Sequence, residues 1–144
     1  MPLVNLTPHQ MGFLLRTPDG DRIVNLPPSG KMCRVTVTNT TVGDAEDIPV
    51  VCPEEGRIVG LPEPSPGVIY IASSIVARIV GPKGRCDVLS PDTTEKGVVR
   101  DGSKQVVAVR NLQSFAPPAE VVAFLEEYRR INTGSAPVIA ANGK

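Results

Sequence analysis

The chain has 144 residues, and its 15 basic residues balance its 15 acidic ones. This neutral balance, with the charges interspersed, disfavours nucleic-acid binding, which more often requires a basic excess or stripe. Three Phe, two Tyr and no Trp leave few rings for stacking on bases or sugars.

The cysteines and the histidine bear on metal binding and on the compartment. Cys33, Cys52 and Cys86 lie far apart, and His9 is the single histidine. This set lacks the spacing of a zinc site, so we expect no metal and no other cofactor, and free thiols in a reducing compartment. The first ten residues lack the features of a signal peptide, and no run reaches the ~18 apolar residues of a membrane span. We therefore expect a cytosolic protein that does not contact a membrane.

Short strands are expected along most of the chain. Val and Ile dominate the apolar residues, and 15 prolines and 13 glycines predict many turns. We place the strands at 3–6, 11–17, 22–26, 31–39, 48–51, 57–61, 68–72, 86–89, 98–100 and 105–112.

The segment 31–39 has the clearest alternation of apolar and polar residues. A period of two predicts a half-buried antiparallel strand. We expect a polar loop at 40–47, a turn at 53–56, and a stiff extended connector at 62–67, where proline recurs at every second position.

A short helix is expected after the apolar run at 68–72. Ser73 or Ser74 can cap its N-terminus, and it would cover residues 75–80. The Gly81–Gly84 segment then has the spacing of the GxxG loop with which KH domains hold a nucleic-acid backbone. A KH domain needs a helix after that loop, whereas 86–89 predicts a strand, so we expect an ordinary helix-to-strand turn.

The clearest helix is predicted at 117–131. Two prolines suit its first turn, and its charges match the helix dipole. Its apolar stripe consists of Val121, Phe124, Leu125, Tyr128 and Ile131. The stripe would pack either on its own domain or on a partner, and we expect a homo-oligomer in which this helix is one candidate contact.

The domain organisation follows from these elements. We expect a β-rich domain at 1–116, the C-terminal helix at 117–132 and a flexible tail at 133–144. The predicted fold class is mainly β: a small barrel or sandwich of eight to ten short strands, with one short internal helix and a C-terminal amphipathic helix.

Six short motifs carry a resemblance to known proteins. They are NLTPHQ (5–10), DIPVV (47–51), GLPEP (60–64), YIASSIVA (70–77), DVLSPDTT (87–94) and VRD (99–101). Their order and wording resemble a group of small bacteriophage and prophage proteins. The resemblance covers about residues 3–115 and implies a phage or prophage origin. It implies no activity and no catalytic residues.

Polar residues at the ends of the apolar runs predict a binding region. The segment 90–94 could hold a phosphate or ribose with its hydroxyls and backbone N–H groups, while nearby arginines supply positive charge. The candidate ligand-binding residues are Thr7, His9, Ser73, Ser74, Arg78, Arg85, Ser90, Asp92, Thr93, Thr94 and Arg100. The alternative is a self-satisfied turn, because Ser, Asp and Thr readily bond their own backbone.

His9 is the one candidate general base. It would need a serine nucleophile, such as Ser73, Ser74 or Ser90, and an orienting acid, such as Asp87 or Asp92. The sequence has no nucleophile elbow, so we expect no enzyme.

The leading functional hypothesis is therefore a non-enzymatic, phage-encoded binding protein of the host cytoplasm. Its ligand would be small and anionic, such as a nucleotide signal of host defence. A virion accessory or decoration protein is the first alternative, and a small hydrolase-like enzyme using His9 is the second. Binding to nucleic acid is not expected.

Overall fold

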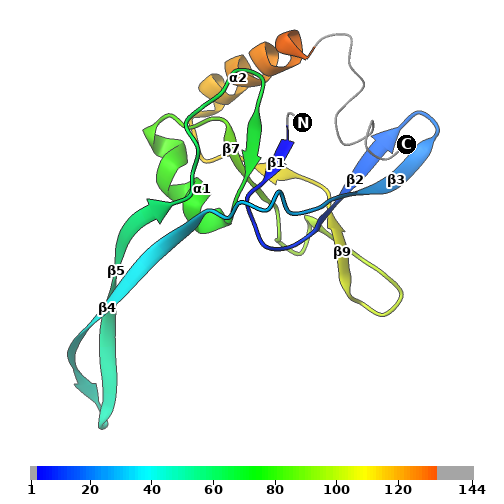
Figure 1. The fold of residues 1–144 in the computed structure, drawn as a ribbon. Helices are drawn as coiled ribbons and strands as arrows, with labels where there is room; N and C mark the ends of the chain where they lie inside the picture. Colours follow the sequence, from blue (N-terminus) through cyan, green and yellow to red (C-terminus); the bar gives the residue numbers. More distant parts are fainter. Residues whose placement is uncertain (1–2, 133–144) are drawn as a thin grey trace.

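The computed structural model describes residues 3–132, apart from the side chain of Glu55. Its ten strands form two four-stranded sheets and one two-stranded ribbon (Figure 1). The first sheet has the order β1 (Leu3–Asn5), β6 (Ile69–Ile71), β7 (Val88–Pro91) and β10 (Leu112–Gln113). Its first three strands are parallel and β10 is antiparallel.

The second sheet joins two hairpins. Its order is β3 (Gly20–Leu26), β2 (Met11–Thr17), β9 (Val106–Val109) and β8 (Val98–Arg100). The β2–β3 hairpin turns at Pro18 and Asp19, and β2 runs parallel to β9.

One core cluster contains residues from both four-stranded sheets. Its buried members are Leu3, Phe13, Leu26, Ile69, Ile71, Leu89, Val98 and Val109. A second cluster lies on the other face of the first sheet, where Tyr70 and Val88 meet the short helix α1 (Ser74–Val80). The period of two in β6 explains this division, since Ile69 and Ile71 point to one face and Tyr70 to the other.

Helix α1 makes the crossover between the parallel strands β6 and β7. Ser73 is its N-cap, and the Ser73 hydroxyl accepts a hydrogen bond from the N–H of Val76. A 3₁₀ turn at Gly81–Lys83 follows, and the chain then enters β7. The segment 81–84 is thus a turn between a helix and a strand, as expected.

Helix α2 (Pro118–Ile131) packs on the core through few side chains. Phe124 and Tyr128 pack against the first core cluster, but no residue of α2 is fully buried. The end of α2 approaches Gly67, where an added Cβ would lie 2.6 Å from Cγ2 of Ile131. Part of the predicted apolar stripe thus packs on its own domain, and a contact of α2 with a partner stays a prediction. The predicted tail at 133–144 lies outside the described residues.

The ribbon of β4 (Arg34–Ala45) and β5 (Ile48–Val59) corrects three sequence predictions. The expected loop at 40–47 is the end of β4 and the turn at Glu46–Asp47. The expected turn at 53–56 lies inside β5. The strand expected to be half-buried is almost entirely exposed, because the ribbon leaves the body of the protein (Figure 1).

The predicted fold class is confirmed: the chain is mainly β, with one short internal helix and a C-terminal helix. The barrel form is wrong, since the sheets of the described residues do not close. The strand expected at 105–112 is divided into β9 and β10, which belong to different sheets. Within residues 3–132 no helix is both long and apolar enough to cross a membrane.

Candidate functional site

The polar segments predicted as a site follow the carboxyl ends of the three parallel strands. Thr7 and His9 follow β1, Ser73 and Ser74 follow β6, and Ser90 to Thr94 lie at the end of β7. The carboxyl ends of parallel strands lie at one edge of a sheet, which is where open α/β sheets bind ligands. The topology therefore brings eight of the eleven predicted residues to one edge.

The first of these segments is a closed network around Asn5. The buried Asn5 amide donates to the carbonyl oxygens of His9 (2.8 Å) and Leu26 (3.2 Å). Its Oδ1 accepts from the N–H (3.0 Å) and hydroxyl (2.7 Å) of Thr7. Thr7 thus stabilises the turn, and the exposed His9 contributes its backbone. Sequence reasoning missed Asn5, although a polar residue inside an apolar strand was a signal.

The predicted site residues in and beside α1 also have structural contacts within the chain. Ser73 caps α1 and Ser74 begins it, with both residues exposed. The guanidinium of Arg78 lies over the ring of Phe115, 4.7 Å from its centroid. Arg78 therefore has a cation–π partner of the kind that holds an arginine against a surface.

Asp92 is the centre of the third segment. Its carboxylate accepts from the N–H (3.1 Å) and hydroxyl (2.7 Å) of Thr94, and from the side-chain amides of Asn111 (3.0 Å) and Gln113 (3.5 Å). Hydrogen bonds from Asn111 and Thr94 lower the pKa of Asp92. This geometry fits the alternative given for residues 90–94, a turn whose polar side chains form hydrogen bonds within the chain.

Two further hydroxyls of the 90–94 segment differ in exposure. Thr93 is exposed and lines a hollow of about 190 Å³ between the segment and β9. Ser90 is fully buried, and its hydroxyl has no hydrogen-bond partner among the described residues. Ser90 is therefore not accessible to a ligand in this conformation.

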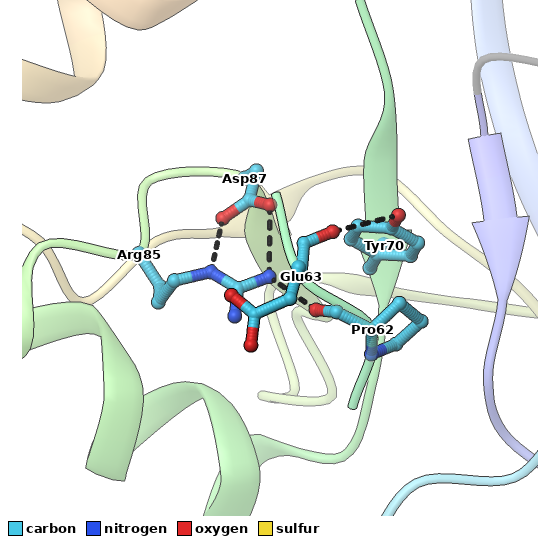
Figure 2. Close-up of polar contacts among 5 residues, drawn as sticks. All are labelled: Pro62, Glu63, Tyr70, Arg85 and Asp87. Atoms are coloured by element: carbon cyan, nitrogen blue, oxygen red, sulfur yellow. Dashed lines mark hydrogen bonds and ion pairs between the residues drawn. The ribbon is translucent and has the colours of Figure 1, made fainter. Parts of the chain in front are cut away.

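We expected Arg85 to bind an anion, but its guanidinium instead links the turn before β7 to the proline connector (Figure 2). Its Nε and Nη2 donate to the two carboxylate oxygens of Asp87 at 2.9 and 3.0 Å, and Nη2 also donates to the carbonyl of Pro62 at 2.9 Å. The hydrogen bond to Asp87 raises the pKa of Arg85. The sequence shows only that the two opposite charges are two residues apart; in the structure they lie in the turn before β7.

Arg100 is also engaged. It pairs with Glu95 at 3.1 Å, and its Nη1 donates to the carbonyl of Lys104 at 2.9 Å. Both side chains of this ion pair are well exposed. Neither Arg85 nor Arg100 points an unengaged guanidinium face into the 90–94 segment, so the expected phosphate cradle is incomplete.

A larger pocket, of about 490 Å³, lies at the opposite edge of the first sheet. Its walls are the proline connector and the inner face of α2, and Arg85, Cys86 and Asp87 form one side. Burial raises the pKa values of the Cys86 thiol and the Tyr128 phenol. The lining is mostly apolar, and Asp87 neutralises the one arginine, which does not suit an anion.

Among residues 3–132 no three His, Cys, Asp or Glu side chains lie close enough to hold a metal ion. Comparison with protein-family models, curated proteins and solved structures gave no match.

The most unusual surface is the β4–β5 ribbon, which we call the arm. It protrudes from the body, with its root near α1 and its tip in solvent (Figure 1). It exposes six large apolar side chains: Val37, Val42, Ile48, Val50, Val51 and Val59. Residues 35–56 also hold five acidic residues and no basic one, a local imbalance that the neutral total conceals.

The root of the arm is fixed in the body. The N–H of Cys33 donates to the carbonyl of Leu6 at 2.9 Å, and Cys33 is buried in the second core cluster. Val35 and Ile58, which face each other across the ladder, pack against the same cluster. The arm is therefore anchored at one end and held out from the body.

Proposed function

We propose that this protein is a non-enzymatic assembly component that contacts a neighbouring protein through the arm. Its setting, given the resemblance of its motifs to phage proteins, is a virion, in which it serves as an accessory or decoration protein. The single observation that carries the proposal is the arm, with exposed apolar side chains along strands of 12 residues each.

Physical reasoning links this surface to assembly. An isolated two-stranded ribbon is marginally stable in water, because it has no second layer to cover its apolar side chains. Contiguous exposed apolar surface of this kind marks interaction sites in soluble proteins. A docked partner would cover the arm and supply the missing layer.

The site geometry supports assembly better than capture of an anionic ligand. Arg85 and Arg100 already pair with carboxylates, and Asp92 is saturated by its own neighbours. The imidazole of His9 is exposed and has no hydrogen-bond partner in the described range, which gives an enzyme hypothesis no oriented base. We propose that the chain is made in the host cytoplasm and acts after incorporation into particles.

Ligand capture remains the second candidate, favoured by the 490 Å³ pocket beside α2. Its apolar walls suit a small apolar or aromatic molecule rather than a nucleotide. Native mass spectrometry of protein purified from infected cells tests this candidate, and a spectrum containing only the mass of the chain would remove it.

The test of the assembly proposal uses an arm-shortened variant. Residues 39–53 are replaced by Asn-Gly, which joins Thr38 to Glu54 through a turn suited to a two-residue hairpin. Purified particles of the phage that carries the gene are then analysed by mass spectrometry. We expect the parent chain in the particles and the shortened chain to be absent, although its thermal melt remains cooperative.

A matched control changes exposed apolar surface elsewhere. Val106→Thr on β9 removes a side chain that is 50% exposed, compared with 66% for Ile48 on the arm. Val106→Thr should leave incorporation unchanged, whereas Ile48→Thr should reduce it. Particles that lack the parent chain would refute the virion setting, and equal incorporation of the shortened chain would refute the role of the arm.

A further inference from the structure

The two outer edges of the arm differ in their capacity to accept another strand. Within residues 3–132, β4 and β5 pair only with each other, so each leaves one edge open. Strand β5 contains Pro49 and Pro53, and a proline is tolerated in a strand only where its missing N–H faces away from the partner. The outer edge of β5 therefore lacks two donors, while β4 has no proline in its 12 residues.

The β4 edge also lacks the charges that usually protect such an edge. Seven of the eight residues 35–42 are Val or Thr, the types that favour strands, and none is charged. Natural edge strands carry lysines, prolines or bulges that prevent pairing with another chain. Here the first bulge within β4 is at Val42, because Thr41 and Gly43 face consecutive residues of β5. The other irregularity of the ladder, between Val35 and Val37, has its extra residue on β5, so residues 35–41 of β4 form an open edge without an inserted residue.

Charges at the two ends of the arm identify the partner. Lys31, Arg34 and Arg57 lie at the exposed root, whereas Asp44, Glu46 and Asp47 lie at the exposed tip. When two arms lie side by side in antiparallel orientation, the acidic tip of each meets the basic root of the other. A parallel arrangement would place like charges together, which is destabilising.

Resting on the assembly role proposed above, we propose that the arm pairs with a second copy of this chain. The β4 strands of two copies join edge to edge and antiparallel, which forms a four-stranded sheet β5–β4–β4′–β5′. Such a contact is isologous, as in most homodimers. Because this open edge runs from Val35 to Thr41, we place the two-fold axis at its central residue, Thr38.

Charge substitution at the centre tests this pairing. Thr38 is exposed in the single chain and faces Glu54 across the ladder, so Thr38→Lys and Thr38→Glu should shift the melting midpoint only slightly, and in opposite directions. In the pair, two like charges would face each other at ~5 Å, and we expect self-association to weaken at least about tenfold. A mixture of the Lys and Glu variants should restore association between unlike copies. Sedimentation over a concentration series measures all three.

Cross-linking gives an independent readout. In a Cys52→Ser background, Thr38→Cys should form a disulfide-linked dimer under mild oxidation, because Cα atoms of opposed residues lie ~4.5–5.5 Å apart. The exposed Cys52 of the parent is the matched control. It lies on β5, so two copies of it would be three strand spacings apart, about 14 Å across the sheet, with a further offset along the strands, and should not link.

The outcomes separate this pairing from the assembly role. A parent dimer that neither charge variant weakens would overturn pairing through β4. A parent that stays monomeric at every concentration, while the shortened arm is still lost from particles, would overturn the second copy as partner and leave the assembly role standing. Loss of dimerisation in both charge variants, with recovery in their mixture, is the expected result.

Discussion

Replacing Arg85 by Ala should strongly destabilise the protein. The substitution removes three hydrogen bonds and leaves the Asp87 carboxylate, whose side chain is 6% exposed, without its cation. Breaking a buried ion pair from one side costs ~3–5 kcal/mol. The Arg85 side chain is 20% exposed, so water reaches part of the site and we expect the lower end of that range, about 3 kcal/mol. For a chain of this size that corresponds to a fall of about 10 °C in melting midpoint.

Thermal and urea melts of the parent and four variants measure this effect: Arg85→Ala, Asp87→Ala, the double variant and Arg100→Ala. Arg100→Ala is the matched control, because its partner Glu95 is 80% exposed and exposed pairs contribute little. The double variant Arg85→Ala/Asp87→Ala should be more stable than the sum of its single variants implies, since no charge is left unpaired. If Arg85→Ala and Arg100→Ala had the same melting midpoint, the Arg85–Asp87 ion pair would contribute no more than an exposed pair. Our description of it as a buried, stabilising contact would then be wrong.

Three further expectations concern other parts of the chain. Cys52 should react with a thiol reagent at the rate of an exposed thiol, whereas Cys33 should react only on unfolding, because it is buried and burial raises its pKa; equal rates in a timed assay would contradict this. The pKa of Asp92 is lowered in the folded state, so its contribution is present above about pH 4 and is lost as the pH falls through the folded value. Asp92→Asn should therefore flatten the acid limb of the melting midpoint, and an unaltered limb would count against the network. Gly67→Ala should loosen α2, since Gly67 has a φ of +72° and a new Cβ would lie 2.6 Å from a methyl carbon of the helix. Faster limited proteolysis of α2 is expected. Gly84→Ala is the control, because that glycine also has a positive φ (+104°) but no atom within 4 Å of an added Cβ.

Local signals in the sequence predicted most elements of the body. The serine before an apolar stretch located α1, and paired prolines with suitable charges located α2. The parallel pairing of β1 with β6 could not be predicted, because no local signal specifies which of many short strands become neighbours. That pairing is what brings the polar segments to one edge.

The arm was missed for reasons that its residues explain. Its turn is formed by Glu46 and Asp47, which both have positive φ values without the Asn or Gly that usually indicates such a turn. Pro53 and Gly56 suggest a turn, but the proline faces the open edge and Gly56 lies at a bulge opposite Thr36. The sequence predicted which residues gather at the candidate site, but it did not predict that their side chains already bind one another. In particular, sequence alone does not show that Arg85 is paired with Asp87.

The pairing of early strands with late ones also sets the order in which the molecule can form. Phe13 on β2 pairs with Val109 on β9, and at ~5–20 residues per second a ribosome needs roughly 5–20 s to make the chain between them. The arm pairs only neighbouring segments, and a hairpin forms within ~10 μs of its synthesis. The arm of a nascent chain can therefore form and reopen on an unfinished body for several seconds, since an isolated ribbon is only marginally stable. During that time neighbouring chains on one messenger can meet through their arms before either core has closed.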